Sequence, residues 1–430
     1  MSDVGQIGLL GLGVVGGQVH RLLTEKAMVI AQRGGRAVTV RRILVRDAAK
    51  PRATGVERSL ITTDARDILD DPAVDVVIEL IGGERPAADY IRQALQAGKH
   101  VITANKEVMA KQGPLLLALA REQGVGLYYE ASVGGGIPLI APFRRDLVAN
   151  RIRSIRAILN GTTNYILTRM ANGGAELGTA LAEAQAAGYA EADPAKDLDG
   201  MDAACKLAIL ATLAYHAPVT LDVVYTEGIR GLAARDFRYA QEMGYAIKLL
   251  AIAQEQDGTI EARVHPAFLP AHTFLAQVHG VYNAVVVEGD LTGPVLFYGL
   301  GAGAAPTASA VVADLIGFLK NMDQEGYRDP GFLAEGTVSI RPMSKVRARY
   351  YLRMPVEDRP GILAEIARIL SDGQISISSL FQRHMDQTAR TADVVLMTQR
   401  TQEEAMQRAR AELSTLAVGR ESPGLIRVEE

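Results

Sequence analysis

The chain has 430 residues, of which 48% are hydrophobic and 22% are charged. This length suggests about three domains at roughly 150 residues each, and the apolar content excludes a disordered protein. The 46 basic and 49 acidic residues give a net charge of −3 without a long run of either sign, which argues against a nucleic-acid partner.

The sequence contains a single cysteine, Cys205. An intramolecular disulfide is therefore excluded, and a reducing, cytoplasmic setting is expected. No apolar stretch reaches the about 18 residues that a membrane span requires, so we expect no membrane partner.

Residues 1–135 alternate short apolar runs with amphipathic segments. Apolar strands separated by helices are typical of a parallel sheet covered on both faces, which predicts a Rossmann-type doubly wound α/β domain. The predicted strands are 6–10, 37–45, 74–81, 100–103 and 125–130, and the predicted helices are 16–28 and 86–97.

Residues 136–320 have a different sequence pattern, in which Ala-rich segments typical of helices are followed by segments typical of strands. We predict an α+β domain with its own core. Its predicted helices are 178–187, 202–215 and 239–253, and its predicted strands are 260–264 and 283–288.

The last quarter of the chain begins with a connector at 321–348, which is rich in Gly, Pro and charged residues. We expect the tail that follows it to be separable from the rest of the chain. Residues 349–430 then give the order βαββαβ, which is ferredoxin-like. The predicted strands are 349–354, 375–382, 391–399 and 424–428, and the predicted helices are 360–371 and 401–413.

A glycine-rich loop, Gly11-Leu12-Gly13-Val14-Val15-Gly16, follows the first strand and opens a helix. In this context the first glycine allows a tight turn, the second a close approach of a pyrophosphate, and the third close helix packing. The phosphates of a dinucleotide would then lie at the helix N-terminus. The second strand is followed by Arg46, which favours NADP, and by Asp47, which keeps NAD possible.

Two polar segments follow later strands. Thr103-Ala104-Asn105-Lys106 lies at the carboxyl edge of the predicted sheet, where Lys106 either reaches a ligand or is a surface lysine. Glu130-Ala131-Ser132-Val133-Gly134-Gly135-Gly136-Ile137-Pro138 offers a carboxylate and open carbonyl groups. Such oxygens suit a hard cation, although a glycine-rich crossover between domains is equally consistent with them.

Two further segments lie in the second predicted domain. Asn160-Gly161-Thr162-Thr163-Asn164 is typical of a turn with a helix N-cap. Residues 188–206 carry five carboxylates before a helix, and Asp202 and Lys206 form an i,i+4 pair. These acids either favour the helix dipole or hold a substrate ammonium, with the lysine exchanging a proton with an oxygen.

Together these motifs resemble homoserine dehydrogenases. The resemblance rests on GLGVVG, TANK, EASVGGGIPLI, NGTTNYIL and GYAEADPAKDLDGMDAACKLAIL, in this order, and covers residues 5–320. It implies reversible hydride transfer between NAD(P)H and L-aspartate 4-semialdehyde, giving L-homoserine in threonine, methionine and isoleucine biosynthesis. The segment 299–307 is similar to the family's return of the chain to the cofactor domain at 300–320. Residues 136–320 would then be a substrate and dimerisation domain.

The resemblance also implies residue roles. Lys206 is expected to donate the proton to the alkoxide, with Lys106 beside the reacting carbon and the cofactor. Substrate binding is expected from Glu191, Asp202 and Asp197. The cofactor is expected to contact Gly11, Leu12, Gly13, Val14, Val15, Gly16, Arg46, Thr103, Lys106, Gly188 and Gly303. A sodium ion is expected at Glu130, Val133, Gly135 and Ile137.

Residues 356–363 resemble the strand-to-helix turn of ACT domains, small amino-acid sensors. Threonine is the effector expected by analogy, bound at Asp358 and Gly361, and a dimerisation role without a ligand is the alternative. The tail is expected to be dispensable for the chemistry. We expect a homo-oligomer, either a dimer or a tetramer. Two other functions stay open, another nicotinamide-dependent semialdehyde dehydrogenase and a non-enzymatic amino-acid sensor.

Overall fold

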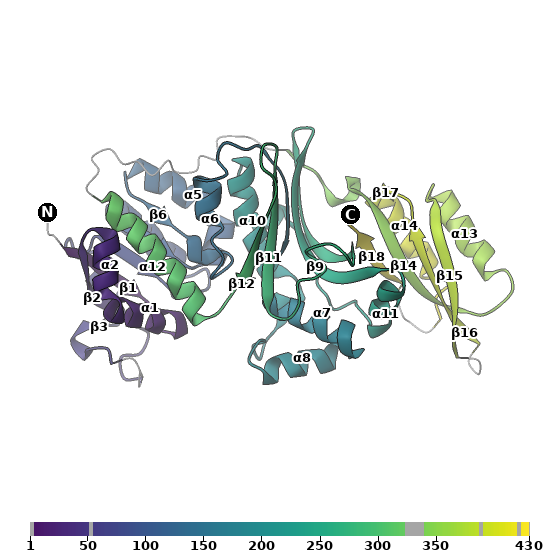
Figure 1. The fold of residues 1–430 in the computed structure, drawn as a ribbon, viewed down its shortest axis with the longest axis horizontal. Coiled ribbons are helices and arrows are strands. Elements are labelled where there is room, and N and C mark those ends of the chain that lie inside the picture. The colour runs from purple at the N-terminus through teal and green to yellow at the C-terminus, as the bar shows by residue number, and fades with distance from the viewer. Residues whose placement is uncertain (1–3, 51–54, 323–338, 387–389, 419–422, 430) are drawn as a thin grey trace. The chain divides into compact units, whose positions relative to one another are not determined.

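The computed structural model describes residues 4–50, 55–322, 339–386, 390–418 and 423–429 (Figure 1). The chain forms two compact units. The first unit comprises Met1–Ile155, Cys205–Val224 and Val285–Val338, and the second comprises Arg156–Ala204, Tyr225–Ala284 and Ser339–Glu430. Within the described residues no helix is both long and apolar enough to cross a membrane.

The first unit is built on a six-stranded sheet with the order β3-β2-β1-β4-β5-β6. Every neighbouring pair in it is parallel, which confirms the predicted Rossmann-type sheet. The strands are β1 (Val4–Leu10), β2 (Ala37–Leu44), β3 (Ile61–Thr62), β4 (Val76–Glu79), β5 (His100–Thr103) and β6 (Leu127–Tyr128).

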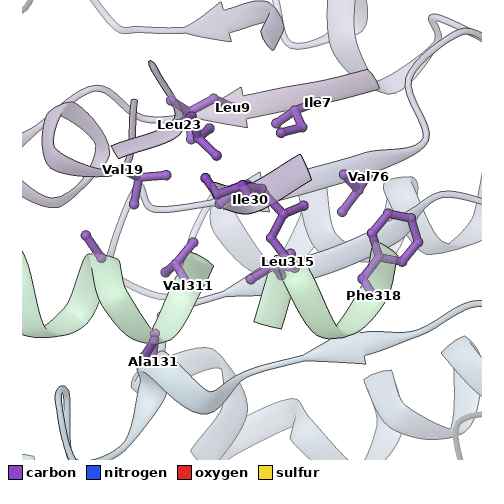
Figure 2. Packing of buried hydrophobic residues seen from close by; sticks show 14 of the residues in the cluster. Ile7, Leu9, Val19, Leu23, Ile30, Val76, Ala131, Val311, Leu315 and Phe318 are labelled. Atoms are coloured by element: carbon purple, nitrogen blue, oxygen red, sulfur yellow. The ribbon is translucent and has the colours of Figure 1, made fainter. Parts of the chain in front are cut away.

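Helices cover this sheet, and its central strands β1, β4 and β5 are therefore largely buried. They are α1 (Val14–Glu25), α2 (Ala27–Gly34), α3 (Arg66–Leu69), α4 (Ala87–Gln96), α5 (Lys106–Glu122), α6 (Ile140–Arg144) and α12 (Ala304–Asn321). Figure 2 shows α12 placing Val311, Leu315 and Phe318 against side chains from β1, α1 and α2. Helix α12, which comes late in the chain, thus completes the hydrophobic core around the six-stranded parallel sheet.

The second unit contains both helices and long strands. Its elements before the tail are α7 (Gly161–Gly173), α8 (Leu177–Ala186), α9 (Ala195–Leu198), β8 (Tyr225–Thr226), α11 (Ala234–Glu242), β9 (Tyr245–Gln256) and β10 (Thr259–Pro270). The chain changes from one unit to the other within β7 (Ile152–Ile158), α10 (Met201–Tyr215) and β11 (Tyr282–Gly289), and β12 (Gly293–Leu300) belongs to the first unit.

The helix predicted at 239–253 is wrong. Helix α11 ends at Glu242, Gly244 takes a positive φ of 78°, and β9 then pairs with β10 in antiparallel register over twelve residues. Residues 247–253 of β9 are buried without interruption, so the strand shows no alternation of polar and apolar residues. An Ala-rich apolar run of this kind does not distinguish a buried strand from a helix.

The tail has the predicted βαββαβ order. It comprises β14 (Arg347–Glu357), α13 (Ile362–Asp372), β15 (Ile377–Asp386), β16 (Thr391–Thr398), α14 (Glu403–Leu413) and β18 (Gly424–Val428), with the short strand β17 (Thr401–Gln402). Its strands run in the order β18-β14-β16-β15, all antiparallel.

The tail is not a separate appendage, contrary to expectation. Strand β18 pairs in parallel with β10, and β13 (Ser339–Ile340) pairs with the other end of β10. Arg341 also donates to Glu261 of β10 at 2.8 Å. The tail therefore shares one sheet with β9 and β10 of the same unit. Most of the predicted connector, residues 323–338, lies outside the described residues.

A buried lysine crosses the core of the second unit. Lys248 of β9 is 3% exposed, and its Nζ donates to the Asn164 side chain at 3.2 Å and to the Val278 carbonyl group. Burial lowers the pKa of Lys248 to about 8. Below that pH both the folded and unfolded chains carry the charge, so the folded state bears the full desolvation cost.

We predict that Lys248→Met changes the pH dependence of stability. As the pH rises from about 8 to 10, folded wild type releases a proton that the unfolded chain keeps, so wild type gains stability relative to the variant. The gain is at most about 1.4 kcal/mol per pH unit. Denaturant unfolding of both proteins at several pH values measures it, and parallel pH curves would contradict it.

Candidate active site

The carboxyl edge of the first unit's sheet carries a cleft of about 850 Å³. It lies over the neighbouring strands β1 and β4, where the strand order reverses and ligands of such sheets bind. Gly11, Leu12, Gly13 and Val14 line it. On its other sides lie Leu44, Val45, Arg46, Asp47, Lys50, Thr63, Leu80, Ile81, Pro86 and Tyr90.

The three glycines of the loop meet different constraints. Gly11 has a φ of 100°, and a Cβ there would lie 2.8 Å from the Leu80 carbonyl oxygen. A Cβ on Gly16 would lie 2.1 Å from the Gly11 carbonyl oxygen, so only glycine lets the helix pack this closely. Gly13, the N-cap of α1, faces open space. This is the position where a pyrophosphate needs room.

The last two loop residues expected at the cofactor do not line the cleft. Val15 is half-buried and packs against the core of the unit, and Gly16 is buried. Beyond the loop, Arg46 is exposed at the end of β2. Asp47 uses one carboxylate oxygen within its own turn, where it accepts from the Ala49 N–H at 2.8 Å.

A second cavity, of about 190 Å³, brings the two predicted catalytic lysines together. Lys106 lies at the first position of α5, and Lys206 lies on α10, where it is 7% exposed. The rest of the lining comes from three loops, residues 82–83, 104–107 and 131–135, and from Gly301, Ala302 and Thr307 before and within α12. All these residues belong to the first unit.

A buried carboxylate that the sequence analysis missed supports this cavity. Glu79, at the end of β4, is 0% exposed and accepts from the Thr103 hydroxyl at 2.6 Å and from the Ile81 N–H at 2.7 Å. Burial raises the pKa of Glu79, and these hydrogen bonds oppose the rise. Glu79 thereby fixes the ends of β4 and β5 together. Its only sequence signal is a carboxylate inside an apolar strand.

Thr103 and Asn105 continue this network toward Lys106. The Thr103 hydroxyl accepts from the Asn105 N–H at 3.0 Å, and the Asn105 side chain donates to the Gly83 carbonyl at 2.7 Å. Asn105 also caps α5 by accepting from Val108 N at 3.1 Å. The Thr103 side chain, predicted at the cofactor, is therefore buried inside the network and holds the loop that carries Lys106.

The glycine-rich segment after β6 packs against the returning chain. A Cβ on Gly135 would lie 2.7 Å from the Gly301 carbonyl oxygen, and Gly136 N donates to the Leu300 carbonyl at 3.1 Å. Gly303 has a φ of 123° and forms the N-cap of α12. These contacts hold the start of α12 beside the lysine cavity.

Glu130 does not present its carboxylate to a cation. Its two oxygens accept from the N–H groups of Leu139, Ile140 and Ala141 at 2.6, 2.9 and 2.7 Å. The other three expected ligand positions, Val133, Gly135 and Ile137, are buried residues of the same segment.

The predicted substrate acids, Glu191, Asp197 and Asp202, lie in the second unit. Asp202 is in the first turn of α10. The Asn160 side chain donates to Asp197 at 2.7 Å and to Asp202 at 2.8 Å, so it joins two of the three acids. Asn160 also caps α7 as predicted, accepting from Thr163 N at 2.8 Å. Its bridging role was missed because a cap motif explains the residue fully. Glu191 and Gly188 are exposed on the preceding loop.

Comparison with known proteins follows the same division of the chain. Residues 11–130 match the family model "Homoserine dehydrogenase, NAD binding domain", residues 138–316 match "Homoserine dehydrogenase", and residues 350–415 match "ACT domain". A homoserine dehydrogenase of Pseudomonas aeruginosa is 42% identical over 416 residues, 96% of this chain and 95% of that protein.

The chain belongs to the homoserine dehydrogenase family. The crystal structure of a homoserine dehydrogenase from Thiobacillus denitrificans is similar with a TM-score of 0.92 and 43% identity, covering 99% of this chain and 98% of that one. A hyperthermophilic archaeal homoserine dehydrogenase in complex with NADPH is similar with a TM-score of 0.62 and 28% identity, covering 73% of this chain and 97% of that one.

Membership of this family establishes the activity. The chain is an NAD(P)-dependent oxidoreductase that acts on a CH–OH group and interconverts L-homoserine and L-aspartate 4-semialdehyde. The expectation of a nicotinamide cofactor is confirmed, as is the C-terminal ACT domain. Cys205 is buried on α10, which argues against the alternative of a semialdehyde dehydrogenase with a cysteine nucleophile.

We predict that Thr103→Val impairs the site without touching a ligand. The change removes the Thr103 hydroxyl from Glu79, which keeps the Ile81 N–H, and leaves the Asn105 N–H without that acceptor. This costs about 1–3 kcal/mol of unfolding free energy. Displacement of the loop before Lys106 should lower kcat/KM at least about tenfold. Steady-state kinetics and thermal unfolding measure both effects.

The matched control for this prediction is Thr103→Ser, which keeps the hydroxyl. It should restore both kcat/KM and stability. Wild-type kcat/KM in the Val variant would show that the network is not needed to hold Lys106.

Proposed function

We propose that Lys206 is the general acid and base of the reaction and that Lys106 acts beside it. The observation that carries this proposal is that both lysines line one small cavity at the carboxyl edge of the sheet. A carbonyl oxygen that gains negative charge needs a proton donor or a cation nearby, and two ammonium groups supply both. The bound nicotinamide supplies or accepts the hydride.

The substrate acids are proposed to bind the amino-acid end of homoserine. Asp202 lies one helical turn before Lys206 on α10, so the two side chains share a face of that helix. Asn160 holds Asp197 and Asp202 together, and Glu191 is exposed on the loop before them. An ammonium group is the natural partner of such a carboxylate cluster. Asp197 also supports Lys206 in this proposal.

The cofactor is proposed to be NADP, with NAD possible. Arg46 and Lys50 both line the larger cleft beyond the end of β2, and two cations there suit a 2'-phosphate. Asp47 lies between them and suits a free 2'-hydroxyl group. Gly188 and Gly303, both exposed and both with a positive φ, are proposed to approach the cofactor through their backbone. The complex of the archaeal relative contains NADPH.

A sodium ion is proposed at the carbonyl oxygens of Val133, Gly135 and Ile137. Glu130 would shape this site by capping α6 through its carboxylate, and any contact of Glu130 with the ion would use its carbonyl oxygen. The ion would fix the segment that packs on the start of α12.

The tail is proposed to bind threonine at the turn between β14 and α13. Gly361 has a φ of 91°, caps α13 and faces open space, and Arg359 pairs with Glu365 through two hydrogen bonds of 2.7 and 2.9 Å. Asp358 accepts from the Gln382 side chain at 2.9 Å. An ammonium would bind at the carboxylate and a carboxylate at the helix N-terminus.

A homo-oligomer, dimer or tetramer, is proposed through β12. Leu296, Tyr298 and Leu300 alternate along this strand and are 42%, 54% and 44% exposed. Three large apolar side chains on one face of a strand are typical of an interface between copies.

We predict that Lys206→Ala lowers kcat for homoserine oxidation at least about a hundredfold while cofactor binding is nearly unchanged. Steady-state rates and fluorescence titration with NADPH measure the two effects. Lys111→Ala is the matched control, because Lys111 lies on α5 outside the cavity and pairs with Glu84 at 2.6 Å. Near-normal turnover of the Lys206 variant would overturn the assignment.

We predict that Arg46→Ala weakens the binding of NADPH by about tenfold and that of NADH much less. The reason is that a charge-assisted hydrogen bond to the 2'-phosphate is lost. The KM values for both coenzymes measure this. Equal effects on the two coenzymes would mean that Arg46 does not contact the 2'-phosphate.

A further inference from the structure

An arginine of the tail, Arg427, forms an ion pair with a segment of the second unit that lies outside the tail. Arg427 on β18 is 1% exposed, and its Nε and Nη2 donate to the two carboxylate oxygens of Glu403 at 2.8 and 2.5 Å. Its Nη1 donates to Glu227 at 2.7 Å, and its guanidinium lies over the Tyr225 ring at 5.2 Å. Glu227 and Tyr225 belong to residues 225–230, called the relay segment below.

The relay segment is held by β10 as well as by Arg427. Strand β8 within it pairs with β10, and Glu227 N donates to the Val264 carbonyl at 2.8 Å. Its position is therefore determined by the sheet that the tail extends. The side chain of Glu227 is 35% exposed, so it is a boundary group between the tail and the rest of the unit.

The opposite side of the relay segment touches the turn at residues 198–200. Ile229 N donates to the Leu198 carbonyl at 2.8 Å, and Arg230 pairs with Asp199 at 2.5 Å. A Cβ on Gly228 would lie 2.1 Å from the Leu198 carbonyl oxygen and 2.6 Å from the Asp199 Cα. No space separates the two segments at this point, so a displacement of one displaces the other.

The turn carries the acids that are proposed to bind the substrate. Asp197 precedes it and Asp202 follows it, and the Asn160 amide bridges their carboxylates. Gly200 within the turn has a φ of 82°, and a Cβ there would lie 3.1 Å from the Thr226 side chain. The acids therefore extend from a turn that the relay segment packs against on one side.

We propose that Arg427 and Glu227 are positioning residues for the substrate acids. The tail holds the relay segment through the contact between Arg427 and Glu227, and the relay segment holds the turn from which Asp197 and Asp202 extend. This inference rests on the proposed substrate role of those acids. It makes the tail part of the substrate site's support and gives an effector on the tail a direct route to substrate affinity.

The route makes a specific kinetic prediction. Loosening the turn weakens the hold on the amino-acid end of homoserine, whereas the cofactor cleft and Lys206 belong to the other unit and contain none of these residues. The KM for homoserine should rise more than kcat falls, and the KM for the coenzyme should stay constant. A loss of general stability would not separate these quantities in this way.

The principal variant is Glu227→Ala in the full chain. It removes the ion pair between Arg427 and the relay segment, and Arg427 keeps its contacts with Tyr225. The pair between Arg427 and Glu403 also stays intact, so the tail keeps its own buried charge partner. We expect the KM for homoserine to rise about three- to tenfold, the range for mutations along a coupled network. Glu227→Gln keeps an acceptor oxygen for Arg427 and should have an intermediate effect.

The matched control is Arg341→Gln. It removes a different ion pair to β10, that with Glu261 at 2.8 Å, without touching the relay segment. Its KM for homoserine should equal that of wild type. Equilibrium titration with homoserine and thermal unfolding of each variant accompany the kinetics, so that a loss of fold is recognised.

The outcomes separate this inference from the proposed function. If Asp202→Asn raises the KM for homoserine and Glu227→Ala does not, the positioning role is refuted and the substrate role stands. If Glu227→Ala and Arg341→Gln raise it equally, the effect is general loosening and the positioning role is also refuted. If Asp202→Asn leaves it unchanged, the proposed substrate role itself fails.

Discussion

The hydrogen bonds of the buried Glu79 carboxylate are the interaction on which the carboxyl edge of the first unit's sheet depends. Two parallel strands end side by side there, and each end leaves backbone and side-chain polar groups that must find partners away from water. Glu79 accepts from Ile81 N and the Thr103 hydroxyl, and so connects the loop after β4 to the loop after β5. The first loop lines both cavities, and the second begins the helix that carries Lys106.

Glycine solves a different constraint at the same edge, which is space. A Cβ on Gly11 would lie within 3 Å of the Leu80 carbonyl oxygen, and one on Gly16 within 3 Å of the Gly11 carbonyl oxygen. A Cβ on Gly135, in the segment after β6, would lie equally close to the carbonyl oxygen of Gly301 in the return before α12. A glycine carries no side chain that would cover its backbone, so a ligand can approach the N–H and carbonyl groups closely at these positions. At α1 this backbone offers N–H groups of the kind that bind the phosphates of a dinucleotide.

Much of this architecture could be predicted from the sequence because local signals agreed with one another. The loop at 11–16 had its strand and helix, and the βαββαβ tail had its order and spacing. The prediction failed at 239–253 because a strand buried on both faces carries no periodicity that distinguishes it from a helix. Glu79 and the bridge at Asn160 were missed because their partners lie 24 to 42 residues away, and no local pattern reports such contacts.

The expectation that the tail is separable was wrong, because the sequence pattern does not show which buried charges pair across the fold. Arg353 and Arg427 are among the largest fully buried side chains, and each pairs with a carboxylate outside the tail, Asp236 or Glu227. Taking such ions out of water costs several kcal/mol each, and only partners in good geometry offset that cost. A tail joined to the rest of the chain only by its connector would not bury its arginines against carboxylates that lie outside the tail. Their pairing with Asp236 and Glu227 favours this one position of the tail on β10 and the relay segment, because any other position loses both ion pairs.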